Sequence, residues 1–292
     1  MRAPEEIFDL IKSVASQDQN ILAVYYGGSR ANPNVDPDIY QDIDVVFVVK
    51  EIAPYIKDHS FIEKFGEVLL LQEPDLMDAR RGLIPFDFST RYVFLTLYKD
   101  GNRMDITLKT LEAANEELAQ EKMNIILLDK NNYLKQIGQP TDEDYHNTIP
   151  DQANFEACSN EFFWCLNNVI KGIARDELTY AHTMFDVYVK EQFYKMLDWM
   201  LAVKYQGKIS SGKLGKFYKK YLSKEEYELL CKTFPGADYD SFWAALDSAI
   251  ELFLQAVRYI AENTDLIFSE KDAEGLKEYL YKVKNKEYRY SE

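Results

Sequence analysis

The sequence predicts an α+β protein with a strand-rich N-terminal half and a helical C-terminal half. In the first half, short apolar runs bounded by turn signals alternate with stretches of helical spacing. A polar segment over 136–151 with one Gly and two Pro separates this half from a second half that shows helical periodicity alone. Because 292 residues suffice for two ordinary domains, we place the boundary near 150 and expect domains over 1–150 and 151–292.

Hydrophobic spacing predicts the elements of the first half. Helices are expected over 4–16, 54–65 and 110–122, the second of them weakly. Strands are expected over 21–26, 43–49, 68–71, 91–98, 103–108 and 125–128. Asp100-Gly101 lies between two of these strands and predicts a hairpin. The charged, Pro-containing stretch 73–88 is expected to form loop and short turns.

The second half has the pattern of a helical bundle. Helical periodicity covers 152–175, 177–206, 223–233 and 240–263. The stretch 210–220 is rich in Gly and Lys and predicts a turn.

The charge balance is acidic throughout, with a net charge of −15. Residues 1–150 hold 15 Lys and Arg against 26 Asp and Glu, and residues 151–292 hold 19 against 23. Nucleic-acid binding depends on basic surfaces that neutralise phosphates, so no nucleic-acid partner is expected. The acidic balance either serves solubility alone or attracts a small cationic substrate.

Cysteine usage and the N-terminal residues favour a cytoplasmic protein. Cys158, Cys165 and Cys231 are odd in number and have no metal-ligand spacing, which indicates reduced thiols. The first 16 residues are acidic and periodic, unlike a signal peptide. No apolar run approaches the roughly 20 residues that a membrane span needs. The three His show no catalytic or metal-binding arrangement.

The strongest chemical signal lies between Tyr25 and Val49. An apolar run ends in a small-residue turn, where Gly28 permits close backbone approach and Ser29 adds a donor, as phosphate binding requires. A polar loop follows, and the next apolar run opens with Asp42 and Asp44. Alternate residues of a strand share a face, so these two carboxylates are expected side by side, as in a divalent metal site. The alternative is a solvated strand start or a turn cap.

A third carboxylate, Asp105, is expected on a later strand, where Arg103, Asp105 and Thr107 share one face. If this strand neighbours that of Asp44, three carboxylates meet at one edge of a small sheet. Two of them can bridge metal ions, and the third completes the metal site or takes a proton from an attacking hydroxyl. The alternative is an exposed carboxylate beside a hairpin.

These residues resemble the signature of the nucleotidyltransferase superfamily. The Gly-Ser-Arg turn, the QDIDV run and the NRMDITL strand resemble the aminoglycoside 6-adenylyltransferases in particular. The helical segments 159–178 and 211–222 resemble later parts of the same family, so the likeness covers most of the chain. It implies an N-terminal nucleotidyltransferase domain, a small mixed sheet flanked by helices, and a C-terminal helical bundle that binds substrate and nucleotide.

The resemblance also implies an activity. Such enzymes transfer AMP from MgATP to a hydroxyl of streptomycin and release pyrophosphate. Asp42 and Asp44 then correspond to the Mg²⁺ ligands, and Asp105 to the third ligand or the general base. Ser29 corresponds to a contact of the outer phosphates, while Arg30 either contacts phosphate or braces the loop.

In the helical half, basic residues are candidates for nucleotide binding. Lys171 and Arg175 share a helix face and either neutralise triphosphate oxygens or form a solvated basic face. Lys213 and Lys216 lie in the Gly-rich turn and suit a second phosphate contact. Tyr218 is a candidate for stacking on adenine.

A polycationic aminoglycoside calls for carboxylates beside an aromatic wall. Glu161 and Trp164, on one helical turn, are the first candidates, and Asp129 at the end of a strand is another. The alternative is that Trp164 belongs to the core and Glu161 to the surface.

Two other functions are compatible with these motifs. One is the same chemistry on another aminoglycoside, a lincosamide or a protein hydroxyl, since substrate choice depends on the helical half. The other is a non-catalytic, nucleotide-binding regulatory module, which the complete carboxylate set disfavours. We expect a monomer or a weak homodimer.

Overall fold

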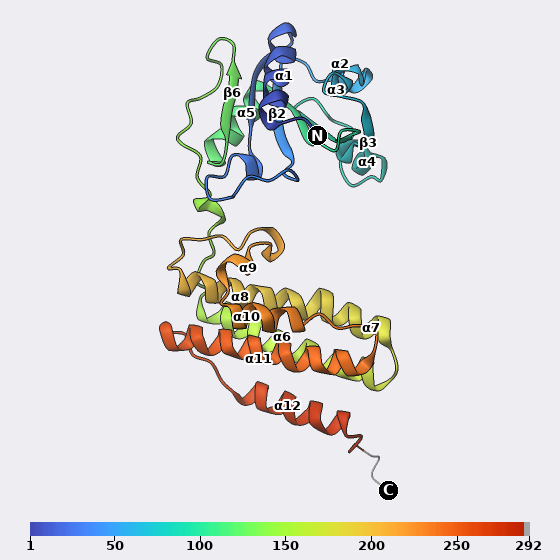
Figure 1. The fold of residues 1–292 in the computed structure, drawn as a ribbon, viewed down its shortest axis with the longest axis vertical. Helices are drawn as coiled ribbons and strands as arrows, with labels where there is room; N and C mark the ends of the chain where they lie inside the picture. The colour runs from blue at the N-terminus through green and yellow to red at the C-terminus, as the bar shows by residue number, and fades with distance from the viewer. Residues whose placement is uncertain (289–292) are drawn as a thin grey trace. The chain divides into compact units, whose positions relative to one another are not determined.

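The computed structural model describes residues 1–288 and divides the chain into two compact units, Met1–Asp144 and Tyr145–Glu292 (Figure 1). The division falls six residues before the boundary expected from the sequence. The first unit is a mixed sheet with helices, and the second is helical, as the α+β pattern predicts. Within 1–288, no helix combines the length and apolar character that crossing a membrane requires.

The sheet of the first unit has six strands in the order β3-β4-β5-β2-β1-β6. Their bounds are β1 Ile21–Tyr26, β2 Ile43–Val49, β3 Val68–Gln72, β4 Arg91–Tyr98, β5 Arg103–Lys109 and β6 Ile125–Asp129. The central pair, β2 and β5, is parallel, and the other pairs are antiparallel. All six predicted strands are present, and the two strands that carry Asp44 and Asp105 are neighbours.

The first unit has two longer helices, α1 and α5, and several short helical segments. They are α1 Pro4–Gln17, η1 Gly28–Arg30, α2 Ala53–Lys57, α3 Ser60–Glu63, α4 Pro74–Arg80, α5 Leu111–Gln120 and η2 Glu143–Tyr145. Pro4 opens α1, where its missing N–H costs nothing. The Thr110 side chain accepts a hydrogen bond from the Ala113 amide and caps α5.

The two faces of the sheet are buried by different helices. On one face, Val45 and Phe47 of β2 pack in a core with Ile7 and Ile11 of α1. On the other face, Val48 of β2 packs with residues of α5. Because side chains alternate along a strand, β2 and β5 each have one face toward the α1 core and the other toward α5. The polar face of β5 is the one on the same side of the sheet as α5.

The second unit is built of helices around one apolar core (Figure 1, yellow-green to red). Its elements are α6 Gln152–Ala174, α7 Leu178–Thr183, η3 Met184–Val189, α8 Lys190–Lys204, η4 Lys213–Gly215, α9 Tyr218–Tyr221, α10 Lys224–Lys232, α11 Tyr239–Asn263 and α12 Lys271–Lys284. Side-chain caps from Asp151, Ser223 and Asp238 fix the starts of α6, α10 and α11.

The structure differs from the sequence prediction at four elements. The helix expected over 54–65 is divided into α2 and α3 by Asp58 and His59. The stretch expected as loop contains α4, because Pro74 stands at a helix start rather than inside a turn. The helix expected over 177–206 is interrupted by η3, a π-helical segment. The last helix, α12, was not predicted; it buries only Ala273, Leu276 and Leu280.

Candidate active site

Asp44 and Asp105 are brought together by strand register. In the parallel pairing of β2 and β5, Asp44 is directly opposite Asp105, as Val46 is opposite Thr107. Side chains at paired positions project to the same face about 4.8 Å apart. α5 packs on this face near Val48, at the other end of β2. The two carboxylates therefore lie together at the end of the sheet away from that packing.

The Gly-Ser-Arg turn lies directly against Asp44. The turn follows β1 as η1, and the Gly27 amide donates to the Asp44 carbonyl at 3.0 Å. Gly28 has a φ of +67°, and a Cβ built on it would stand 1.9 Å from Asp44 Oδ2. Only glycine satisfies both the left-handed backbone and this contact. The turn and the carboxylate thus form one site, with Ser29 beside it.

Arg30 braces the loop that leads to the carboxylates. Its Nε donates to the Asp42 carbonyl at 3.0 Å, and its Nη2 donates to the Gln41 carbonyl at 2.6 Å. Of the two roles that the sequence left open, the structure shows the bracing role. Asp42 itself immediately precedes β2, so its backbone position depends on this brace.

Arg103, which is not among the site residues predicted from the sequence, sits between two of the candidate carboxylates. Its Nε and Nη2 donate to the two oxygens of Asp105 at 2.9 and 2.8 Å, and its Nη1 lies 3.4 Å from Asp42 Oδ2. The hydrogen bonds to Asp105 raise the pKa of Arg103 above its usual value. The Arg-x-Asp spacing on one strand was the available signal, because it places both side chains on one face.

The carboxylate oxygens of this cluster are suitable ligands for a magnesium ion. In this structure, however, a positively charged side chain, Arg103, already contacts two of the three carboxylates. Aspartate oxygens are the ligands that Mg²⁺ prefers, and two of the three aspartates are register partners. Across residues 1–288, no three carboxylate, thiol or imidazole groups are gathered closely enough to hold a metal ion. The guanidinium of Arg103 instead contacts Asp42 and Asp105.

In the helical unit, Lys213 and Lys216 lie on a loop of unusual backbone conformation. Gly212, Leu214 and Gly215 have φ values of +74°, +57° and +71°, and Leu214 is 89% exposed. The amides of Gly212, Gly215 and Phe217 all donate within the loop, so internal hydrogen bonds hold this conformation. Lys213 and Lys216 are exposed on this loop, and their charge makes it a candidate phosphate contact.

Tyr218 does not offer its ring to a base, and the proposal that it stacks on adenine is wrong. The side chain is buried, and its hydroxyl donates to Asp198 at 2.7 Å. A Cβ on Gly215 would stand 2.0 Å from the ring. Burial also raises the pKa of Asp198 above its usual value. The role of Tyr218 is to support the loop from beneath.

The second basic pair lies elsewhere in the helical unit. Lys171 and Arg175 are at the C-terminal end of α6, where they line an open pocket of about 640 Å³ with Tyr279. The loop of Lys213 is tied to the opposite end of α6, because the Ser211 amide donates to Asn147 just before that helix. The 23 residues of α6, about 35 Å of helix, lie between these two ends. The two basic pairs are therefore separate candidate contacts.

The residues expected to bind substrate are found in different settings. Trp164 is 65% exposed and lines a groove of about 500 Å³ with Asn160 and Tyr279, so it is not a core residue. Glu161 is exposed on α6 and accepts a hydrogen bond from Cys165 Sγ at 3.2 Å. Asp129 accepts from two backbone amides at the end of β6, each at 2.9 Å. Its carboxylate thus stabilises a turn.

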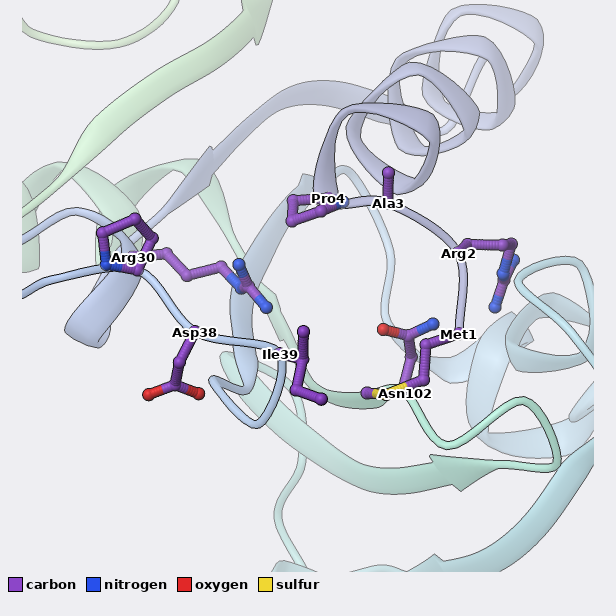
Figure 2. A pocket seen from close by; sticks show the side chains of 9 residues that line it. Met1, Arg2, Ala3, Pro4, Arg30, Asp38, Ile39 and Asn102 are labelled. Carbon is purple, nitrogen blue, oxygen red and sulfur yellow. The ribbon is translucent and has the colours of Figure 1, made fainter.

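A cavity of about 420 Å³ lies behind Arg30, beside the N-terminal residues (Figure 2). Figure 2 shows the Arg30 side chain extending toward it, with Asp38 and Ile39 on one side and Pro4 on another. Neither Asp44 nor the other two candidate carboxylates line it. The cavity therefore borders Arg30 but none of the three candidate carboxylates.

Comparison with known proteins connects this geometry to a family. The family described as streptomycin adenylyltransferase matches residues 1–283. The chain belongs to this family. Members of the streptomycin adenylyltransferase family are nucleotidyltransferases, so the resemblance inferred from the motifs is confirmed and the protein is an enzyme.

Curated relatives match over nearly the whole chain. An aminoglycoside 6-adenylyltransferase of Campylobacter jejuni is 32% identical over 286 residues, covering 98% of this chain and 97% of the relative. One of Bacillus subtilis is 30% identical, covering 96% and 97%. One of Staphylococcus aureus is 32% identical, covering 87% and 89%. A crystal structure of an aminoglycoside 6-adenyltransferase from Bacillus subtilis aligns with a TM-score of 0.47 at 26% identity, covering 97% of this chain and 99% of that one.

Proposed function

We propose that this adenylyltransferase transfers AMP from MgATP to the 6-hydroxyl of streptomycin, releases pyrophosphate and so confers resistance to the drug. The alignment of Asp44 with Asp105, beside the turn of Gly28 and Ser29, is the observation that carries the proposal. The names of the curated relatives support an aminoglycoside as the acceptor. The enzyme then works in the cytoplasm, with ATP and a cationic aminoglycoside as its partners.

The chemistry is a single in-line displacement. The acceptor hydroxyl oxygen forms a bond to the α-phosphorus of ATP, and the bond from that phosphorus to the bridging oxygen of pyrophosphate breaks. Asp105 is placed either to take the hydroxyl proton or to complete the metal ligand set, and Asp42 and Asp44 would hold Mg²⁺. When bound, the metal neutralises phosphate charge.

Each unit offers its own candidate contacts for phosphate. The Gly28 turn presents backbone N–H groups and the Ser29 hydroxyl next to Asp44. Lys213 and Lys216 supply positive charge from an exposed loop of the second unit. The pair of Lys171 and Arg175 is a separate candidate contact, because it lies at the other end of α6 from that loop.

Recognition of the acceptor uses charge and an aromatic surface. Streptomycin carries guanidinium groups, and the chain has a net charge of −15 that attracts such a cation. Trp164 offers an exposed indole for cation–π contact, with Glu161 on the same helix. Asp129 is not part of this proposal, since its carboxylate is used in a turn.

The test is incubation of the full chain with α-³²P-ATP, Mg²⁺ and a panel of aminoglycosides, followed by chromatography and mass spectrometry of the product. We expect labelled AMP on streptomycin and stoichiometric pyrophosphate. Transfer to a different aminoglycoside with none to streptomycin would correct the acceptor. A folded enzyme that binds MgATP and labels no member of the panel would overturn the proposal.

A further inference from the structure

Arg103 makes a fork-like contact with the carboxylates at the end of β2 and β5. Two of its nitrogens donate to the two oxygens of Asp105, at 2.9 and 2.8 Å. A third nitrogen lies 3.4 Å from Asp42 Oδ2. One guanidinium therefore joins an aspartate of β5 to the aspartate that precedes β2.

This contact has an electrostatic reason. Asp105 is the register partner of Asp44, so like charges face each other across the β2–β5 ladder, with Asp42 two residues away. Unless a positive charge compensates them, such carboxylates raise the free energy of the folded chain. Arg103 supplies that charge within the chain, and its planar fork matches a carboxylate in a bidentate geometry.

The same oxygens are those that a divalent metal needs. Resting on the function proposed above, we propose that Arg103 is a positioning residue that holds Asp42 and Asp105 in the metal-free enzyme and competes with the divalent cation for them. Metal ions alone then bind weakly, because each must displace the guanidinium.

Displacement is feasible because the contact is open to solvent. The Arg103 side chain is 46% exposed, and those of Asp42 and Asp105 are 37% and 20% exposed. Exposed ion pairs contribute little to stability, so a divalent cation that arrives with a nucleotide can replace one. The released guanidinium is a good partner for phosphate oxygens. Binding of the nucleotide therefore increases the affinity for the metal, and binding of the metal increases the affinity for the nucleotide. Arg103 is the residue through which the two are coupled.

The experiment measures Mn²⁺ binding to the full chain by electron paramagnetic resonance of the free ion, with and without a non-hydrolysable ATP analogue. The variants are Arg103→Gln and Arg103→Lys, and the matched control is Arg91→Gln. Arg91 is also an exposed strand arginine paired with an aspartate, Asp75 at 3.0 Å, and its loss changes the net charge equally.

Without nucleotide, we expect Arg103→Gln to bind Mn²⁺ about tenfold more tightly than wild type, a size typical of coupling between sites. Arg91→Gln should match wild type. With the ATP analogue present, the advantage of Arg103→Gln should shrink, because the wild-type guanidinium then has phosphate as an alternative partner. The melting temperature of Arg103→Gln should be lower than that of wild type without metal and should rise more on addition of Mn²⁺.

Equal or weaker Mn²⁺ binding by a folded Arg103→Gln would overturn the inference while leaving the proposed function intact. If Arg103→Gln does not fold, Arg103→Lys decides: it lacks the fork, so tighter Mn²⁺ binding supports the inference and unchanged binding overturns it. If wild type binds no Mn²⁺ even with the ATP analogue, the proposed metal site fails as well.

Discussion

Asp44 and Asp105 lie at the same register position of the parallel strands β2 and β5. A contact with Gly28 confines the first, and a bidentate hydrogen bond with Arg103 holds the second. Each carboxylate is thus fixed by a different element while both face the same side of the sheet. Because different neighbours hold the two aspartates, replacing each one tests a different set of contacts.

Replacing either aspartate by asparagine should reduce AMP transfer by at least about 100-fold, since a carboxylate that binds metal or accepts a proton contributes that much. The melting temperature of Asp44→Asn should not fall, because a like-charge repulsion is removed. Activity is measured by label transfer and stability by thermal unfolding.

Asp129→Asn is the control. It should keep its activity and lose about 1 kcal/mol, as one backbone hydrogen bond to Asp129 is lost. Full turnover by Asp105→Asn would remove Asp105 from the mechanism.

Gly28→Ala should abolish most activity by pushing the Asp44 carboxylate from its place, since the new Cβ would lie 1.9 Å from Oδ2. Gly82→Ala is the matched control: Gly82 has a similar φ of +74°, and nothing lies within 4 Å of its Cβ position. Both variants should lose roughly 1–2 kcal/mol for the left-handed backbone. Only the first should lose activity by more than about tenfold, as misplaced catalytic groups do. Equal activity in the two variants would contradict the contact.

Lys213→Ala and Lys216→Ala should raise the KM for ATP severalfold, because each removes a positive charge from the loop assigned to phosphate. Lys219→Ala, on the neighbouring α9, is the control and should leave the KM unchanged. The readout is initial velocity against ATP concentration at fixed streptomycin. An unchanged KM in both loop variants would argue that this loop does not meet the nucleotide.

The three thiols should differ sharply in reactivity. Burial raises the pKa of the Cys158 and Cys165 thiols to about 12, so both remain protonated at pH 8 and unreactive. Cys231 is exposed. Ellman's reagent should therefore titrate one thiol in the native protein and three after unfolding in guanidinium chloride. Rapid reaction of a second native thiol would show that α6 packs differently from the structure.

Much of the fold follows from local patterning. The strands from β1 to β6 were predicted within one residue, because each has an apolar run that must be buried on at least one face. α12 was not predicted, because its sequence is polar and carries Gly275 in mid-helix. It is stabilised by contact with α6, which no local pattern reveals.

The candidate site was predicted in part. Gly28, Asp44 and Asp105 were selected by residue type and strand alternation, and the structure places them together. The contacts of Arg103 were not predicted, because its partners include Asp42 on another segment. The burial of Tyr218 was missed for the same reason, since its hydroxyl bonds to Asp198 of α8.

The sequence alone determined which residue types the site contains and which strands carry them, because strand alternation and turn propensity are local properties. The tertiary structure decided which of these residues meet. The parallel pairing of β2 with β5 aligned Asp44 with Asp105 and placed Arg103 close to Asp42. It also put Lys171 and Lys213 at opposite ends of α6. Such relations depend on pairing between segments distant in the chain, where the free energy of burying apolar faces selects one register.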